Sequence, residues 1–278
     1  MQSFQIGNNE KGQRFDKYLK KLLSGAPGSF IYKMLRKKNI TLNGKKADGS
    51  EKLKQGDEVK LFLSDETIQK FSKAAPNVSA RYPYIPLEVI YEDQDILAIN
   101  KPVGMLSQKA DAGDLSANEY IVGYLLKKQE ITEQDLLTFR PSVCNRLDRN
   151  TSGLLVAGKS LQGLQDMAKQ LKGRSVEKYY RCLVKGKAFE GRTLEGWLSK
   201  DGESNQVTVS KQESPGSKYI KITYAPVAYY RLGEQGTATL LEVQLITGRS
   251  HQIRVQLAAA GHPVIGDCKY GERAVNEW

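Results

Sequence analysis

The sequence has little of what marks a membrane or secreted protein. Nothing in it approaches the run of about 18 apolar residues that a transmembrane helix needs. Its first residues, Met-Gln-Ser-Phe, lack the basic and apolar regions of a signal peptide. These absences predict a cytoplasmic protein that does not associate with a membrane.

Cysteine and histidine are also scarce, with three and two residues respectively. Cys144, Cys182 and Cys268 are far apart and odd in number, and their spacing fits neither a disulfide framework nor a zinc site. The sequence also contains no glycine-rich dinucleotide loop and no phosphate-binding loop of the nucleotide-hydrolase type. We therefore expect reduced thiols, no metal and no cofactor.

Positive charge is abundant and unevenly placed. The chain of 278 residues has 42 Lys and Arg against 31 Asp and Glu, a net charge of +11. Residues 1–85 hold 17 of the basic and 8 of the acidic residues, a net +9. Such a concentration indicates a polyanionic partner, and nucleic acid is favoured over a membrane because no strongly apolar helical face accompanies the charge. The alternative is a solvated surface without a partner.

The basic N-terminal part combines two helical patterns with turns and short strands. Residues 14–23 and 29–38 have apolar residues at helical spacing, and Gly25, Pro27 and Gly28 separate them. Asn43-Gly44 predicts a tight hairpin, and residues 58–63 alternate like a strand. Residues 64–85 show no clear periodicity and are interpreted as a linker.

This arrangement over residues 12–63 resembles the alpha-L RNA-binding domain, the type named after the fourth small-subunit ribosomal protein. The resemblance implies domains at 1–63 and 86–278, joined by the linker 64–85. It also implies that basic side chains of the first domain contact RNA phosphates, which position a protein without reading sequence. These residues are Lys33, Arg36, Lys37, Lys38 and Lys45.

The second domain reads as a mixture of hairpins and helices. Residues 89–91 and 96–99 flank an acidic turn, and Ser116 and Glu119 have the spacing of a capping box. Ser160 is the predicted N-cap of a helix over 161–171 whose apolar stripe is expected to lie in the core. Alternating runs within residues 193–247 predict an antiparallel sheet, so the fold class is α+β with a mixed, mainly antiparallel sheet.

A polar segment, Cys144–Gly153, leads directly into the apolar run 154–157. Its carboxylate, Asp148, lies between Arg146 and Arg149, and neighbouring positive charge favours the ionised form. Thr151, Ser152 and Gly153 read as a tight turn before a buried strand. On composition alone, the commoner role of such an aspartate is an ion pair in a loop.

The order of these residues resembles the active-site motif of the RluA-type pseudouridine synthases, Arg-Leu-Asp-x-x-Thr-Ser-Gly-Leu-Leu. In that family the aspartate is catalytic, which implies the same role for Asp148. Many members have His where this chain has Asn145, which then becomes a neutral hydrogen-bonding neighbour and a candidate contact to the RNA. Arg146 is a candidate to fill the stack that a flipped base leaves or to hold the displaced strand.

Two other segments extend the resemblance on either side of Asp148. Asn-Lys-Pro-x-Gly at 100–104 is similar to the family's first motif, and Lys101 is either a substrate contact or a solvent-facing strand end. The segment 177–184 is similar to Lys-x-Tyr-x-Ala and aligns Tyr180 with the active-site tyrosine. A strand tyrosine is more often a core or edge residue, and a register slip of one residue would choose Tyr179 instead.

The block 247–255 resembles the third motif of the family, Thr-Gly-Arg-x-His-Gln-Ile-Arg-Val. In the family the second arginine, here Arg254, pairs with the catalytic aspartate, and Gln256 replaces a common His. Arg249 is either a phosphate clamp or part of a surface ion pair. His251 is favoured as a structural residue. The family usually continues past Tyr-Gly with further strand-forming sequence, whereas this sequence stops at Trp278.

We expect a monomeric enzyme that isomerises uridine to pseudouridine in structured RNA. Ribosomal RNA of the large subunit, or its precursor, is favoured over transfer RNA. The first alternative is a catalytically silent RNA-binding protein on the same fold. The second is a metal- or nucleotide-dependent enzyme that modifies RNA, which the missing ligand and phosphate-loop motifs disfavour.

Overall fold

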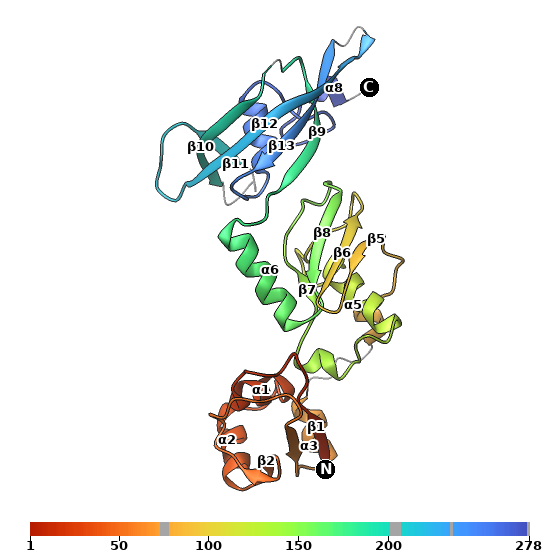
Figure 1. The fold of residues 1–278 in the computed structure, drawn as a ribbon, viewed down its shortest axis with the longest axis vertical. Coiled ribbons are helices and arrows are strands. Elements are labelled where there is room, and N and C mark those ends of the chain that lie inside the picture. The colour runs from red at the N-terminus through yellow and green to blue at the C-terminus, as the bar shows by residue number, and fades with distance from the viewer. Residues whose placement is uncertain (73–77, 189, 201–206, 234–235, 277–278) are drawn as a thin grey trace. The chain divides into compact units, whose positions relative to one another are not determined.

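The computed structural model describes residues 1–72, 78–188, 190–200, 207–233 and 236–276 (Figure 1). They form two compact units, Met1–Lys169 and Gln170–Trp278. The first unit contains an N-terminal body, residues 1–72, and a second four-stranded sheet. Within the described ranges, no helix combines the length and the apolar character needed to cross a lipid bilayer.

The N-terminal body packs its helices on a small sheet of strand order β1-β4-β2-β3. Its strands are β1 (Gln2–Gln5), β2 (Ile40–Leu42), β3 (Lys45–Lys46) and β4 (Glu58–Leu61). Its helices are α1 (Phe15–Leu22), α2 (Gly28–Arg36) and α3 (Asp65–Phe71). Phe15 and Leu19 of α1 and Ile31 of α2 are completely buried in one core, so the two helical predictions are confirmed.

The hairpin between β2 and β3 turns at Asn43-Gly44, as the sequence predicts. Both residues have positive φ, 52° and 71°, which is the conformation that a two-residue hairpin of this kind needs. Asn43 suits the place for a second reason. Its Oδ1 accepts a hydrogen bond from the backbone N–H of Glu58 at 2.8 Å, and its Nδ2 donates to Asp57 at 2.9 Å.

The segment interpreted as a linker contains α3 and a further short helix, α4 (Val78–Arg81). Ser64 caps α3 by accepting a hydrogen bond from the N–H of Thr67 at 3.3 Å. Ile68 is the one buried residue of α3, and it joins the core of the N-terminal body. A helix that buries a single side chain has no apolar period, which explains why the sequence did not reveal it.

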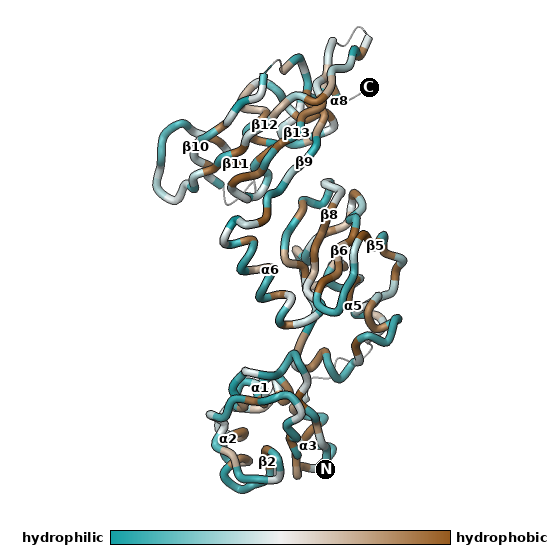
Figure 2. Tube along the Cα trace, viewed as in Figure 1, coloured by the Kyte–Doolittle hydropathy of each residue, from teal (hydrophilic) through white to brown (hydrophobic). Residues whose placement is uncertain are grey.

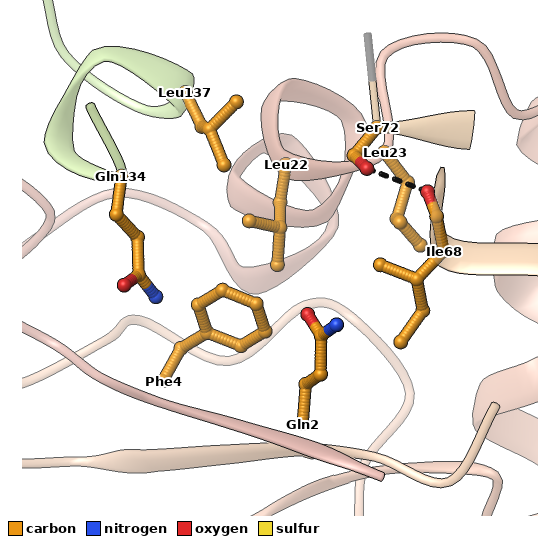
Figure 3. A pocket seen from close by; sticks show the side chains of 8 residues that line it. All are labelled: Gln2, Phe4, Leu22, Leu23, Ile68, Ser72, Gln134 and Leu137. Atoms are coloured by element: carbon orange, nitrogen blue, oxygen red, sulfur yellow. Dashed lines mark hydrogen bonds between the residues drawn. The ribbon is translucent and has the colours of Figure 1, made fainter. Parts of the chain in front are cut away.

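A small cavity of about 170 Å³ lies where the N-terminal body meets the rest of the first unit (Figure 3). Phe4 and Leu22 line it from the body, and Gln134 and Leu137 line it from the other side. Nearby, Thr138 Oγ1 donates to Glu10 at 2.8 Å. The body is therefore fastened to its unit by side-chain contacts as well as by the chain.

The second sheet of the first unit has the order β5-β6-β8-β7, with antiparallel pairing throughout. Its strands are β5 (Val89–Glu92), β6 (Ile96–Lys101), β7 (Ser142–Val143) and β8 (Gly153–Gly158). Hydrophobic residues lie along β6 and β8 (Figure 2). Leu97 and Leu155 pack with Ile121 of α5 (Ala117–Lys127). The short helix η1 (Asp135–Leu137) precedes β7.

Both helix caps predicted for this part are present. Ser116 and Glu119 form the capping box of α5, and Ser160 Oγ accepts from the N–H of Gly163 at 3.0 Å at the start of α6 (Leu161–Gly173). The apolar stripe of α6 was expected in the core, but Leu164, Met167 and Leu171 are only half-buried. The fully buried residue of α6 is Gly163.

The second unit holds an antiparallel sheet of order β11-β10-β12-β13-β9. Its strands are β9 (Tyr179–Lys185), β10 (Arg192–Lys200), β11 (Val207–Ser210), β12 (Lys218–Arg231) and β13 (Thr237–Leu245). Helix α7 (Gln252–Ala259) packs Leu257 against Leu241 and Val243 of β13, and α8 (Arg273–Asn276) follows. Gly261, with φ of 86°, follows Ala260, the C-cap residue of α7.

Candidate active site

Asp148 lies half-buried in the loop between β7 and β8. Its backbone carbonyl accepts a hydrogen bond from the N–H of Thr151 at 3.0 Å, which closes a turn. Gly153 then begins β8 with φ of 121°, a conformation that residues with a side chain rarely adopt. The predicted tight turn before a buried strand is confirmed.

The segment Lys101–Ser107 packs against this loop, and Lys101 is its most buried member, with an exposed fraction of 0%. Its Nζ donates to the carbonyls of Pro102 at 2.9 Å, Met105 at 2.8 Å and Arg149 at 3.2 Å. A side chain without exposed surface neither faces solvent nor contacts a substrate directly, so both predicted roles of Lys101 are wrong, and the residue supports the loop instead. Burial lowers the pKa of the Lys101 ammonium, and the negative charge of Asp148 opposes that change.

Ser107, at the other end of this segment, was not singled out from the sequence. It is 5% exposed, and its hydroxyl bonds both backbone groups of Leu147, the residue before Asp148. The Oγ accepts from Leu147 N–H at 3.0 Å and donates to Leu147 C=O at 2.8 Å. The two residues are 40 positions apart, so no local pattern could have connected them.

Asn145 and Arg146, both expected to contact RNA, differ in their surroundings. The side chain of Asn145 bonds the backbone of β8: its Oδ1 accepts from Val156 N–H at 2.8 Å, and its Nδ2 donates to Leu154 C=O at 3.2 Å. It therefore fastens the start of the Asp148 loop to the strand that follows. Arg146 is exposed, and within the described residues no carboxylate pairs with it.

Tyr180 is the second residue of β9 and lies opposite Val243 of β13. Its half-buried ring packs against the same core as Leu257 of α7. Tyr179 points to the other face, is 55% exposed and donates its hydroxyl to Glu177 at 3.0 Å. The register therefore assigns Tyr180, rather than Tyr179, to the side of the sheet that α7 covers.

Arg254 on α7 makes a two-point ion pair with Asp267, an acid that the sequence analysis did not identify. Nε lies 2.6 Å from Oδ2 and Nη2 lies 2.8 Å from Oδ1. The Asp267 side chain is only 3% exposed. Burial alone would raise the pKa of Asp267, but the Arg254 pair and the N–H groups of Lys269 and Tyr270 lower it below its ordinary value.

An aromatic ring completes the surroundings of Arg254. The guanidinium carbon lies 5.2 Å from the ring centre of Tyr270, close enough for a cation–π contact. The Tyr270 hydroxyl is 2.9 Å from Nδ1 of His251 and also accepts from the N–H of Val207 at 3.2 Å. His251 has the structural hydrogen bond that was favoured for it.

Arg249 lies on the loop before α7 and is exposed. Its backbone N–H donates to Gln252 at 3.1 Å, so the loop is anchored while the charged side chain faces solvent. Among the described residues Arg249 has no acidic partner, which does not support the surface ion pair. Gln256, which replaces a common His, donates to the carbonyl of Leu194 at 3.0 Å.

Comparison with known proteins agrees with this geometry. Residues 95–259, more than half of the chain, match the family described as RNA pseudouridylate synthase. The chain belongs to this family. Residues 13–59 match the S4 domain. Ribosomal large subunit pseudouridine synthase C of Escherichia coli (strain K12) is 31% identical over 96% of this chain and 79% of that protein.

A relative of the same name in Vibrio cholerae is 28% identical over 98% of this chain and 81% of that protein. The solved structure of human RNA Pseudouridylate Synthase Domain Containing 1 shares the fold. It has a TM-score of 0.55 and 22% identity, and the match covers 69% of this chain and 72% of that one. The chain is thus an RNA pseudouridine synthase, an isomerase with an α+β fold.

The S4 domain of this synthase presents its basic residues to solvent. Lys33 and Arg36 lie on the face of α2 opposite the buried Ile31 and Leu35, and Lys37, the C-cap residue, is exposed as well. Lys38 and Lys45, just beyond α2 and in the hairpin, are also exposed. None of the five has a carboxylate partner within the described residues, so the surface keeps its positive charge available.

The predicted catalytic residues of the synthase are divided between the two units. Asp148 belongs to the first unit, and Tyr180 and Arg254 belong to the second. Within the second unit, Tyr180 and α7 share one face of the sheet. The assembly of all three residues into one site is therefore part of the proposal below.

Proposed function

We propose that this synthase converts uridine to pseudouridine in structured RNA of the large ribosomal subunit. The names of its relatives support that substrate, and the basic surface of the S4 domain is suited to RNA phosphates. Transfer RNA is the second substrate to test. We further propose that the enzyme acts as a monomer in the cytoplasm, where ribosomal RNA of bacteria is processed.

The reaction needs no oxidant and no second substrate. The bond between N1 of uracil and C1′ of ribose breaks, the base rotates, and a bond between C5 and C1′ forms. C5 loses its proton and N1 gains one, so the atoms balance within a single nucleotide. The base must leave its stack to react, and exposed Arg146 is placed to fill the vacated position or hold the displaced strand.

The observation that carries the assignment is the setting of Asp148. It is a half-buried carboxylate whose neighbouring residues on both sides are bonded by the segment Lys101–Ser107, whose two end residues are buried, with the Lys101 ammonium nearby. Such a carboxylate is held in place and acts ionised, as nucleophile or as base. An exposed loop ion pair, the commoner role, would need none of this support.

Arg254 and Tyr180 have the chemistry to complete the site. Arg254 binds Asp267 through Nε and Nη2, and a guanidinium, with its five N–H donors, has the geometry to bind a second carboxylate as well. We assign that carboxylate to Asp148. Tyr180 lies against the uracil face and moves a proton, while Arg249 binds a phosphate of the substrate.

The test is tritium release from ribosomal and transfer RNA labelled at C5 of uracil. We expect release by the parent chain and by Asp111→Asn, which changes an exposed carboxylate in the same unit, and none by Asp148→Asn. Binding of RNA should survive in all three proteins. Release by Asp148→Asn would remove that residue from its role. Binding without release by the parent would favour the silent RNA-binding alternative.

A further inference from the structure

The two residues that flank Asp148 are bonded by opposite ends of one short segment. Ser107 bonds Leu147 on one side at 2.8 and 3.0 Å. On the other side, the carbonyl of Arg149 accepts from Gly104 N–H at 2.8 Å and from Lys101 Nζ at 3.2 Å. Asp148 thus sits between two residues whose backbone groups are fixed. The residues that fix them lie 40 to 48 positions earlier in the sequence.

The segment itself is held by regular structure at both ends. Lys101 is the last residue of β6 and pairs with Gly153, the first residue of β8. Leu106 forms a bridge with Ser116, and its carbonyl accepts from Ala117 N–H at 2.7 Å in the first turn of α5. A displacement of Ser107 would therefore require movement of a strand end or a helix start.

The middle of the segment needs a residue without a side chain. Gly104 has φ of 87°, a conformation that L side chains rarely adopt, and its N–H reaches Arg149 in that conformation. Its carbonyl accepts in return from Arg149 Nε at 3.2 Å. Gly104 and Arg149 are therefore joined by two hydrogen bonds, one to the backbone carbonyl of Arg149 and one from its side chain.

We propose that Ser107 is a positioning residue for Asp148, acting through the backbone of Leu147. Its hydroxyl satisfies the N–H and the C=O of one peptide residue at once, and this fixes the direction in which the next side chain leaves the chain. A misplacement of about 1 Å at a reacting group costs roughly 100-fold in rate. The role rests on the proposed function of Asp148 and adds the group that aims it.

The chain offers a matched control for removing such a hydroxyl. Thr239 of β13 is completely buried, and its Oγ1 accepts from Ala188 N–H at 3.1 Å and donates to Gly186 C=O at 2.7 Å. Ser107→Ala and Thr239→Val therefore each remove one buried hydroxyl that bonds two backbone groups. Both should lower the melting temperature, and only the change at Ser107 should reach the chemistry.

The experiment measures kcat and KM by tritium release, and RNA binding, well below the melting temperature of each variant. We expect Ser107→Ala to lower kcat roughly 10- to 100-fold with KM and RNA affinity unchanged. Ser107→Thr, which keeps the hydroxyl, should recover most of that loss, and Thr239→Val should keep the parent's kcat.

Two results would overturn the proposal. One is a parent-like kcat in folded Ser107→Ala, and the other is an equal loss of kcat in Thr239→Val, which would indicate a general effect of stability. Failure of the proposed function is seen separately, because then either the parent releases no tritium or Asp148→Asn still releases it. If Ser107→Ala does not fold, Ser107→Cys replaces it, since a thiol fills similar space and hydrogen-bonds weakly.

Discussion

The synthase holds its cations in two opposite ways in two regions of the first unit. Five basic residues of the S4 domain, among them Lys37 and Lys45, are exposed and have no carboxylate partner among the described residues. Lys101, by contrast, is buried, the side chain of Lys159 is only 9% exposed, and both are bonded on several sides. Lys101 bonds three carbonyls, and Lys159 reaches Glu92 at 2.8 Å as well as Glu130.

The difference separates binding from positioning. An exposed ammonium on a flexible stem binds phosphates one by one, and salt screens it. A buried cation cannot give up its partners without leaving polar groups unsatisfied, so its loss is felt in folding and in any residue it supports. The S4 surface should therefore tolerate single changes, and the Asp148 region should not.

The largest effect is expected for Lys101→Met. The change leaves three partly buried carbonyls without a charged donor and should lower the free energy of unfolding by about 3 kcal/mol. Because one of these carbonyls belongs to Arg149, the rate should also fall by roughly 100-fold. Urea unfolding and tritium release measure the two effects. Lys127→Met, at an exposed position of α5, should change neither.

Glu92→Gln tests the ion-pair network that Lys159 and Lys128 form with Glu92 and Glu130. Burial alone would raise the pKa of Glu92, but hydrogen bonds from Lys159, Lys128 and Tyr124 lower it from 4.5 to about 2. A carboxylate whose pKa is lowered in the folded state stabilises the fold at pH values above its ordinary pKa. This stabilisation is lost as the pH falls through the lowered pKa. The network should therefore contribute on the order of 3 kcal/mol at neutral pH.

The measurement for Glu92 is urea unfolding between pH 7 and pH 2. The difference between the parent and Glu92→Gln should be constant above about pH 4.5 and should shrink as the pH falls toward 2. Glu133→Gln, an exposed acid of the same unit, should follow the parent at every pH. A difference that does not depend on pH would show that the network stabilises by packing rather than by charge.

Local signals were enough to predict much of the fold. The capping residues Ser116 and Ser160, the Asn43-Gly44 turn and the helical spacing around Phe15 each act over a few residues, and all were predicted. α3 was missed because it buries only Ile68. Each of these outcomes depends on whether the stabilising contact lies within one element.

The site followed the sequence less closely, because its supports are contacts between distant segments. Ser107 and Leu147 are 40 positions apart, and nothing distinguishes Ser107 from an ordinary loop serine. The burial of Lys101 could not be predicted from the sequence either, because the local pattern around a lysine at a strand end is the same whether its ammonium faces solvent or bonds three carbonyls. Asp267 was one of many acids, and only the fold selects it as the partner of Arg254.

Asp267→Asn extends the comparison to ion pairs. Removing the charge leaves the partly buried Arg254 without its two-point partner and should cost about 2 kcal/mol of unfolding free energy. Arg254 would also lose its orientation, so we expect roughly 10-fold slower tritium release. Glu242→Gln is the matched control, since Glu242 pairs with Arg181 in an exposed bridge at 3.1 Å that should be worth less than about 0.5 kcal/mol. Equal losses in both variants would mean that burial does not distinguish the two pairs.

The smallest effect is expected for Lys37→Gln on the S4 surface. One lost phosphate contact should weaken RNA binding only a few-fold, and the slope of log affinity against log salt should become shallower by about 1. Binding titrations at several salt concentrations measure both. Lys127→Gln, outside this surface, should leave the slope as it is. Combining Lys37→Gln with the same change at Lys33 and Lys38 should add the losses, because the exposed side chains share no partner. A slope that stays constant through the series would place the RNA phosphates elsewhere and end the contrast drawn between the two regions.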